Sequence, residues 1–329
     1  MSTRDLVVLG SAAAVPTKTR NHNGYLLRWD GHGILFDPGE GTQRQMIHAG
    51  LGSGDVTWIC VSHFHGDHCL GVSGVIQRIS RDGVRHPVDA AFPASGAAYW
   101  RRLRHAALFH DTAVIRERPL AGDEVALDTG DAPFTLTARR LSHTVETYGY
   151  RLAEPDGVTM LPDRLAALGV EGPLIGRLQR DGAVTTSRTV TLEECSVPRP
   201  GQKAAFVMDT RLCDAAFALA DGADLLIIES TFLEAEAAQA QERGHLTAAQ
   251  AGRVAAEAGV RRLVLTHFSE RYRPEDESRF VAEAASVFDG DIVLVHDLDR
   301  VAMPSRRVPD RTAGRAARAN TDRTPAAEG

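Results

Sequence analysis

The chain contains little cysteine and few aromatic residues. Four of its 329 residues are cysteine (Cys60, Cys69, Cys195 and Cys213), and aromatic residues make up 6%. No two cysteines form a CxxC pair, so we expect reduced thiols in a cytoplasmic protein.

Long apolar runs and a secretory leader are also missing from the sequence. No run approaches the roughly 20 residues that a membrane-spanning helix needs. The first residues, "MSTRDLVVLGSAAAVP", lead almost directly into a strand-like segment without a basic region before a long apolar stretch, so no signal peptide is predicted. The formal net charge of −6 gives no hint of a nucleic-acid partner, which would have to be held by a local basic patch.

Short apolar runs alternate with alanine-rich stretches of helical spacing. With 43% hydrophobic residues, the chain is long enough for one large domain or two small ones. The predicted buried strands are "LVVL", "GILF", "WICVS", "AAFVM", "DLLII", "RLVLTH" and "DIVLVH". The predicted helices lie in "SGAAYWRRLRHAALF", "RLCDAAFALA" and "LTAAQAGRVAAEAG". This mixture predicts a layered α/β domain over residues 1–303.

The C-terminal segment 304–329 differs from the rest in composition. It has one Val and no other large apolar residue, so we predict that it is disordered. Six Arg against three acids give it a charge of +3, which permits weak RNA attraction. Composition alone favours a solvated tail without a role.

The hexapeptide "HFHGDH" follows the predicted strand "WICVS". His63 and His65 can point the same way from an extended segment, while Asp67 and His68 can face a second position after a turn at Gly66, before a helix that starts near Cys69. Imidazole and carboxylate ligands suit Zn²⁺, with Mn²⁺ or Fe as competitors. Nitrogen and oxygen donors without thiolates favour a catalytic site over a structural one, and a His-rich surface loop is the alternative.

Three single residues at predicted strand ends are candidates for the remaining ligands. His143 follows "ARRLS", Asp209 follows "AAFVM" and His267 follows "RLVLT". In this order, the hexapeptide and the three single ligands resemble the metallo-β-lactamase superfamily. The resemblance implies an αββα sandwich with metals at one edge of its two sheets.

The resemblance also implies how the metals are shared. One metal would be held by His63, His65 and His143. The other would be held by Asp67, His68 and His267, and Asp209 would bridge the two together with a water or hydroxide. Two cations about 3.5–4 Å apart generate hydroxide at neutral pH and stabilise charge on the attacking and leaving oxygens. Phosphodiesters, esters, thioesters and lactams all remain possible substrates of such a site.

Further segments resemble ribonuclease Z, the endonuclease family that matures tRNA 3′ ends. They are "PTKTRN", "FDPGEGTQRQ", "GPLIGRLQRDG", "ESTF", "GHLTAAQAG" and "THFSERY". The resemblance implies a zinc-dependent endoribonuclease with two Zn²⁺ per subunit that acts on precursor tRNA. It would leave a 3′-hydroxyl on the tRNA and a 5′-phosphate on the trailer. It also implies a homodimer in which the arm of one subunit presents tRNA to the other subunit's site.

The loop "PTKTRN" offers polar groups to RNA. Lys18 and Arg20 can contact phosphates, and Asn21 can reach a base edge or the backbone. In the family this loop lies close to the acceptor end of the tRNA. A solvated loop is the alternative.

The stretch "GHLTAAQAG" predicts a helix that begins with a capping box, Thr247 and Gln250. The resemblance implies that His245, just outside this start, is a general acid or charge stabiliser and that Glu229 orients it. It also implies that Asp67 is both a ligand and a partner of the metal-bound nucleophile. Leu246 replaces the usual Ser of the family, which puts a hydroxyl role there in doubt.

Residues 154–181 interrupt the strand pattern and resemble the family's tRNA-binding arm. Pro162 and Pro173 suit first helical turns, and Gly172-Pro173 matches the family's Gly-Pro motif. From Asp163 to Arg180, three Arg face one Asp and one Glu, a net charge of +1. Phosphate contacts alone would therefore dock RNA modestly, and an ordinary helical insertion is the alternative.

Two other functions fit parts of the sequence. A hydrolase of small phosphodiesters, sulfate esters or lactones would share the ligands but would not need the arm. A non-enzymatic binding subunit would have lost metal ligands, whereas all seven candidate positions are filled here. Pro38 stands where many relatives have Cys, without evident catalytic meaning.

Overall fold

The computed structural model describes residues 3–307, and these residues form two compact units. The larger unit runs to Ala153 and resumes at Lys203–Pro304, and the smaller unit contains Glu154–Gln202. Most of the predicted tail, 308–329, lies outside the described residues.

The larger unit contains two mixed sheets of seven strands each. The first sheet comprises, in spatial order, β18 (Arg300–Ala302), β1 (Arg4–Gly10), β2 (Gly24–Trp29), β3 (His32–Phe36), β4 (Trp58–Cys60), β5 (Val88–Pro93) and β6 (Ile115–Leu120). The second comprises β17 (Asp291–Leu294), β16 (Arg262–Thr266), β15 (Leu225–Glu229), β14 (Lys203–Val207), β9 (Tyr148–Ala153), β8 (Thr135–Arg140) and β7 (Glu124–Leu127). In each sheet, one half is antiparallel and the other half is parallel.

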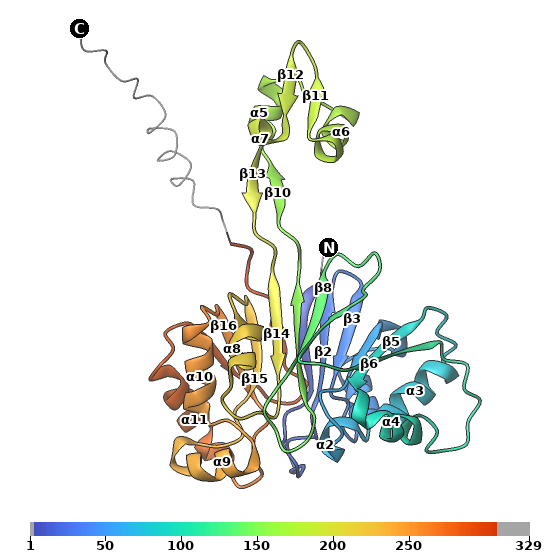
Figure 1. Cartoon of the computed structure of the whole chain (residues 1–329), viewed down its shortest axis with the longest axis vertical. Helices are drawn as coiled ribbons and strands as arrows, with labels where there is room; N and C mark the ends of the chain where they lie inside the picture. The colour runs from blue at the N-terminus through green and yellow to red at the C-terminus, as the bar shows by residue number, and fades with distance from the viewer. Residues whose placement is uncertain (1–2, 308–329) are drawn as a thin grey trace. The chain divides into compact units, whose positions relative to one another are not determined.

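Helices cover the outer face of each sheet, so the unit has four layers (Figure 1). The helices of the first half are α1 (Thr42–His48), α2 (Gly66–Cys69), α3 (Val72–Arg81) and α4 (Ala97–Arg104). Those of the second half are α8 (Asp214–Ala220), α9 (Ala237–Arg243), α10 (Ala248–Glu257) and α11 (Glu277–Ala285). Short 3₁₀ turns lie at Ser53–Asp55, Ala94–Gly96, Glu234–Glu236 and Pro274–Asp276. The predicted αββα sandwich is confirmed.

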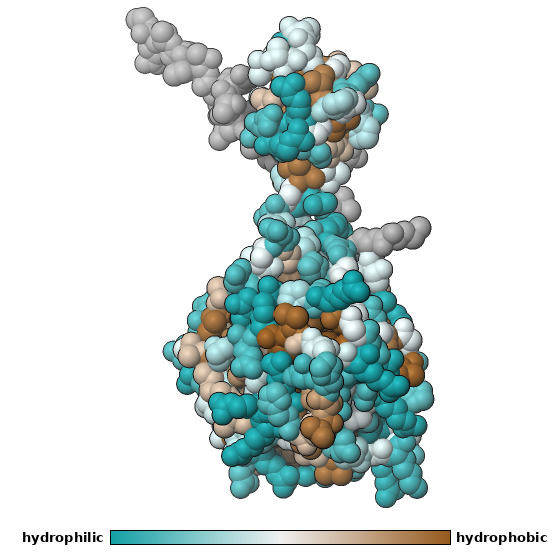
Figure 2. All heavy atoms as spheres, turned by 90° about the vertical axis from the view of Figure 1, so that its right-hand side faces the viewer, coloured by the Kyte–Doolittle hydropathy of each residue, from teal (hydrophilic) through white to brown (hydrophobic). Residues whose placement is uncertain are grey.

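The apolar core lies between the two sheets. Phe36 from the first sheet stacks on Phe206 from the second, with ring centroids 4.4 Å apart. At the sheet edge that carries the site, the Tyr25 hydroxyl bonds the Thr266 hydroxyl at 2.7 Å, and Tyr150 donates to the Val61 carbonyl at 2.8 Å. These buried hydrogen bonds join the two sheets to each other near that edge. The surface shown in Figure 2 is mainly hydrophilic over the larger unit, with scattered hydrophobic patches.

The predicted strands and helices of this unit are confirmed. Each of the seven apolar runs forms a strand, and the three alanine-rich stretches form α4, α8 and α10. The helix expected near Cys69 is instead two helices, because α2 begins at Gly66 and α3 at Val72. Within the described residues, no helix has the length and apolar character needed to cross a membrane.

The smaller unit is built from a strand ribbon and short helices. Its elements are β10 (Gly157–Met160), α5 (Pro162–Ala167), α6 (Pro173–Asp181), β11 (Ala183–Thr185), β12 (Thr189–Thr191), α7 (Leu192–Cys195) and β13 (Ser196–Arg199). β10 pairs with β13 and β11 pairs with β12, both antiparallel (Figure 1). Pro162 and Pro173 begin α5 and α6, as predicted.

The predicted end of the insertion, at 181, is wrong. The unit continues to Gln202, because β11, β12 and β13 fold back onto its helices. These strands have three or four residues each, which is too short to produce a clear alternating pattern. A small core of Leu165, Val170, Leu178, Val184, Val190 and Cys195 holds the unit together.

Candidate metal centre

Seven polar side chains converge where several strands end. His63 follows β4, while Asp67 and His68 lie in α2. From the second sheet, His143, Asp209 and His267 follow β8, β14 and β16, and His65 completes the set. β14, β15 and β16 run parallel, so their carboxyl ends meet at one edge of the sheet.

Three residues at this edge have left-handed backbone conformations that non-glycine residues rarely adopt. The φ angles are 42° at Asp37, 41° at Asp209 and 61° at His267. Such conformations cluster at functional sites, where the surrounding structure holds them in place. Here they turn the side chain of each residue toward the cluster as its strand ends.

The first group of candidate ligands is His63, His65, His143 and Asp209. His65 Nδ1 lies 2.9 Å from His63 Nε2 and 3.4 Å from His143 Nε2. Asp209 Oδ2 lies 3.5 Å from His63 Nε2 and 3.7 Å from His143 Nε2. Three imidazole nitrogens and one carboxylate oxygen therefore surround one point.

The second group is Asp67, His68 and His267. Asp67 Oδ2 lies 3.1 Å from His68 Nε2 and 3.6 Å from His267 Nε2. Asp209 reaches this group as well, with Oδ2 3.4 Å from His68 Nε2 and Oδ1 3.2 Å from His267 Nε2. The carboxylate of Asp209 thus lies between the two groups, where a bridging ligand has to be.

Hydrogen bonds on the far side of each ring fix which nitrogen faces the cluster. His143 Nδ1–H donates to the Gly244 carbonyl at 2.8 Å, and His68 Nδ1–H donates to Asp37 at 2.8 Å. The Ser62 hydroxyl donates to Asp37, so it accepts from His63 Nδ1–H. In His63 and His143, Nε2 is therefore left as a lone pair that points inward, and in His68 Nε2 faces the carboxylates of Asp67 and Asp209.

The same logic applies to His267. The Thr231 hydroxyl donates to Glu229 at 2.5 Å, so it accepts from His267 Nδ1–H at 2.7 Å. His267 Nε2 is thereby also a free lone pair. It and Asp209 Oδ1 are buried atoms without a hydrogen-bond partner.

Burial and the neighbouring carboxylates shift the pKa values of the histidines in the cluster. Burial lowers the pKa of His63, His65 and His143, which keeps these imidazoles neutral as metal ligands must be. At His68, burial also acts to lower the pKa, but the carboxylates of Asp209, Asp67 and Asp37 outweigh it and raise the pKa well above its usual value. The cluster therefore attracts a cation, whether a proton or a metal ion.

These observations fit bound divalent metal. The donors are imidazole nitrogens and carboxylate oxygens, and two of them are buried without a partner. This donor set suits Zn²⁺, Mn²⁺ or Fe, while no cysteine belongs to either group of ligands among the described residues.

His245 and Glu229 lie beside the metal ligands. His245 Nδ1 lies 3.1 Å from Glu229 Oε2 and 3.9 Å from Asp209 Oδ2. Burial acts to lower the pKa of His245, but Glu229 and Asp209 raise it to about 9. The predicted capping box of Thr247 and Gln250 starts α10, and this start places His245 at the cluster.

Leu246 has a structural explanation. Its side chain is fully buried in the apolar cluster between the second sheet and its helices. A hydroxyl at this position would lie in that apolar cluster, so Leu246 contributes packing in place of a polar contact.

The structure revises the prediction for the loop "PTKTRN". Lys18 is exposed, as a phosphate contact must be. Arg20 is only 9% exposed, and its guanidinium donates to Ser11, Glu277 and the Val295 carbonyl. The direct phosphate contact predicted for Arg20 does not fit this environment. The Asn21 amide donates to two backbone carbonyls, so it too holds the loop.

Sequence reasoning missed the residues that orient the ligands. Asp37, Ser62, Thr231 and the Gly244 carbonyl each bond the outer nitrogen of a ligand histidine. Asp37 was visible as an acidic residue at a strand end in "FDPGE". Ser62 and Thr231 carried no signal beyond their position next to a strand end.

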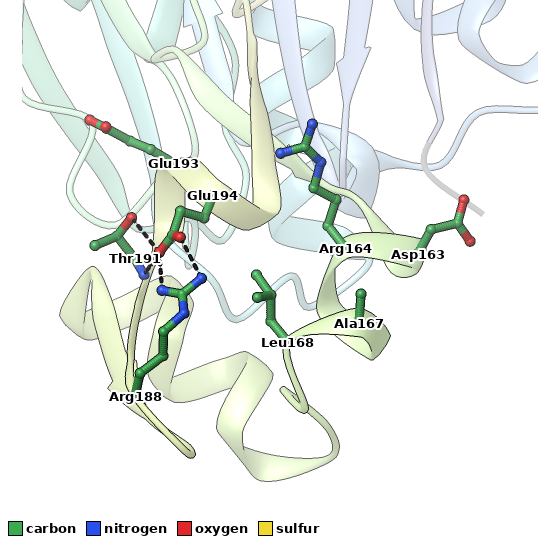
Figure 3. A pocket seen from close by; sticks show the side chains of 8 residues that line it. All are labelled: Asp163, Arg164, Ala167, Leu168, Arg188, Thr191, Glu193 and Glu194. Carbon is green, nitrogen blue, oxygen red and sulfur yellow. Dashed lines mark hydrogen bonds and ion pairs between the residues drawn. The ribbon is translucent and has the colours of Figure 1, made fainter.

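The smaller unit contains a separate pocket of about 500 Å³. Its charged lining residues are Arg164 and Arg188 against Asp163, Glu193 and Glu194, and Arg188 pairs with Glu194 at 2.7 Å (Figure 3). Acids outnumber bases, so this pocket does not suit a phosphate. Gly172 and Pro173 are exposed at the start of α6, where Gly172 has a φ of 53° that favours glycine.

The fold and the metal centre define a hydrolase of the metallo-β-lactamase class. A sequence model of the metallo-beta-lactamase superfamily matches residues 17–158, and one of the beta-lactamase superfamily domain matches 182–268.

Relatives give the family within this class. The chain is 63% identical over 309 residues to Ribonuclease Z of Thermobifida fusca (strain YX), covering 93% of this chain and 97% of that protein. It is 60% identical over 312 residues to Ribonuclease Z of Salinispora arenicola (strain CNS-205), covering 94% and 99%. The crystal structure of human tRNase Z, short form, superposes with a TM-score of 0.64 at 25% identity, covering 91% and 99%. The chain therefore belongs to the ribonuclease Z family of metal-dependent endoribonucleases.

Proposed function

We propose that this chain removes the 3′ trailer from precursor tRNA by hydrolysing a phosphodiester bond. The observation that carries the proposal is the cluster of seven buried or half-buried donors with two unpartnered atoms, in a chain of the ribonuclease Z family. The products would be a tRNA with a 3′-hydroxyl and a trailer with a 5′-phosphate.

We assign one metal ion to each of the two groups of candidate ligands. His63, His65 and His143 would hold one Zn²⁺, and Asp67, His68 and His267 would hold another, with Asp209 between them. Mn²⁺ or Fe would suit the same donors. When bound, such ions lower the pKa of water and stabilise negative charge on phosphate oxygens.

The remaining steps belong to side chains of the chain itself. Asp67 would accept a hydrogen bond from the attacking water and fix its direction. His245, protonated and held by Glu229, would donate a proton to the oxygen that leaves as the tRNA 3′-hydroxyl. Glu229 also accepts from the Thr210 N–H and the Thr231 hydroxyl, which fixes its carboxylate.

The residues that we propose to contact RNA are distinct from the candidate metal ligands. Lys18 is exposed for a phosphate of the acceptor end, while Gly172 and Pro173 are exposed in the smaller unit for a second contact with tRNA. We propose that the enzyme is a homodimer in which one subunit's smaller unit serves the other's metal centre. A mixture of a chain lacking residues 154–202 with a metal-centre variant would then regain activity that neither has alone.

A cytoplasmic location is proposed from the cysteines. All four are free thiols, and three are buried. Cell fractionation tests this location.

One variant tests the catalytic assignment. Asp67→Ala should abolish cleavage of a 3′-extended tRNA while tRNA binding survives. Loss of both cleavage and binding would mean that Asp67 is mainly structural. A parallel assay on precursors with and without an encoded CCA end shows which of them the enzyme accepts.

A hydrolase of small phosphodiesters, sulfate esters or lactones is the alternative. It would use the same metal centre without the smaller unit. Under this alternative the wild type would not cleave a 3′-extended tRNA, and deletion of the smaller unit would leave its activity on small substrates intact.

A further inference from the structure

Arg20 belongs to the loop "PTKTRN", yet its side chain points into the protein. Its Nη1 donates to the Ser11 hydroxyl at 2.6 Å and to the Val295 carbonyl at 2.8 Å, and its Nη2 donates to Glu277 Oε1 at 2.6 Å. The charge is thus neutralised by Glu277 within the protein. A guanidinium whose N–H groups are engaged in this way has few free donors for a phosphate.

The same side chain rests on the residue that follows a metal ligand. The Arg20 guanidinium lies over the Phe268 ring, 4.5 Å from its centroid. Phe268 follows His267, and its backbone bonds Ser11 and Ala13 on the segment before the loop. Arg20 therefore spans the distance between the loop and the chain segment that carries His267.

A second attachment lies beside the first. Asp297 Oδ2 accepts from the Asn21 N–H at 2.6 Å and from Gln45 Nε2 at 3.2 Å, and Asp297 Oδ1 accepts from the Ser11 hydroxyl at 2.9 Å. Ser11 joins the two attachments, since it accepts from Arg20 and donates to Asp297. By contrast, Lys18 is exposed at the outer turn of the loop.

We propose that Arg20 is a positioning residue: it anchors the loop to Glu277 and Phe268 so that Lys18 is held at a fixed place relative to His267. This rests on the proposed function, because Lys18 is the group that would touch RNA. A side chain held in place contributes more to binding than a mobile one, since less conformational entropy is lost when the complex forms.

The anchor and a direct phosphate contact predict opposite effects of Glu277→Gln. This variant removes the charge of the partner and keeps its shape. If Arg20 contacts RNA, a weaker hold by Glu277 frees it and precursor tRNA binds more tightly. If Arg20 is an anchor, the loop loosens and KM for precursor tRNA rises, by about tenfold for a loss of 1.4 kcal/mol.

Salt dependence separates the two roles further. A lost phosphate contact lowers the slope of log affinity against log salt by about one. We expect this change for Lys18→Ala, whereas Arg20→Lys and Glu277→Gln should weaken binding with the wild-type slope. Glu275→Gln, at an exposed neighbouring carboxylate, is the matched control and should change neither quantity.

Hydrogen exchange tests the anchor without any substrate. The Asn21 N–H bonds Asp297, and the Thr17 N–H bonds the Arg20 carbonyl at 2.8 Å, so both amides should be protected in the wild type. Glu277→Gln and Arg20→Lys should speed exchange at residues 17–21 at least tenfold.

Unchanged exchange, tighter tRNA binding or a salt slope reduced in Arg20→Lys would each overturn the proposal. If the wild type fails to bind precursor tRNA, the proposed function fails, and hydrogen exchange still decides on the anchor.

Discussion

At the scale of residues, the metal centre brings buried carboxylates and imidazoles together. Asp37, Asp67, Asp209 and Glu229 are all buried or nearly so around six imidazoles. The pKa of Asp209 is held well below its usual value despite burial, which acts to raise it, because His267, His68 and His245 surround it. A bound cation therefore stabilises the whole cluster, and metal binding and protonation compete for it.

The general-acid role of His245 is testable through the leaving group. His245→Ala should lower kcat on precursor tRNA by about 10²–10⁴, because a ribose oxygen is a poor leaving group without a proton. On bis(p-nitrophenyl) phosphate the loss should be much smaller, since p-nitrophenolate leaves unprotonated. Steady-state kinetics on both substrates measures the difference, with His105→Ala, at an exposed histidine, as control. Equal losses on both substrates would contradict the role.

The orienting role of Asp37 predicts an effect on metal affinity. Asp37→Asn weakens the acceptor of His68 Nδ1–H and of the Ser62 hydroxyl, so both His68 and His63 lose their fixed orientation. We expect metal affinity to fall by about 10–100-fold, measured by competition with a chromophoric chelator. Asp123→Asn, at a carboxylate that is 97% exposed, should leave affinity unchanged. Wild-type affinity in Asp37→Asn would show that the ligands are oriented by other contacts.

The sequence could predict the candidate ligands better than the residues that orient them. His63 to His68 lie within six positions, and the single ligands each follow an apolar run, so both patterns are local. Asp37 and His68 are far apart in sequence, and the bond between them exists only because β3 and β4 are neighbours. Arg20 has the charge of a phosphate contact, and only the fold shows that Ser11, Val295 and Glu277 occupy it.

At the scale of elements, the site depends on strands that end at one edge. Apolar runs such as "DLLII" and "RLVLT" predicted these strands because a buried parallel strand is apolar on both faces. The short strands of the smaller unit give no such signal, so the sequence alone places the end of the insertion at 181. Its helices were predictable from Pro162 and Pro173 at their starts.

The boundary of the smaller unit suggests a clean deletion. β9 and β14 are antiparallel neighbours with Ala153 opposite Lys203, so an Asn-Gly turn can replace Glu154–Gln202 as a hairpin. This variant should keep its metals and its activity on bis(p-nitrophenyl) phosphate but cleave precursor tRNA far more slowly. Metal analysis and both assays check the expectation. Undiminished tRNA cleavage would show that tRNA cleavage does not need the smaller unit.

At the scale of the whole molecule, metal binding and folding are linked. Ligands from both sheets meet at the centre, so a metal ion bound there holds the sheets together. Metal at about a hundred times its Kd should stabilise the fold by about 2.7 kcal/mol. Thermal unfolding with and without chelator should therefore show a lower Tm after metal removal, restored by Zn²⁺. An unchanged Tm in a chain shown to have lost its metal would contradict this linkage.

The proposed function is tested most directly by cleavage of a 3′-extended tRNA by metal-loaded protein, with both product ends identified. We predict one cut after the discriminator nucleotide, a 3′-hydroxyl on the tRNA, a 5′-phosphate on the trailer and two metal ions per chain. No cleavage with either Zn²⁺ or Mn²⁺, or a 2′,3′-cyclic phosphate on the tRNA, would contradict it.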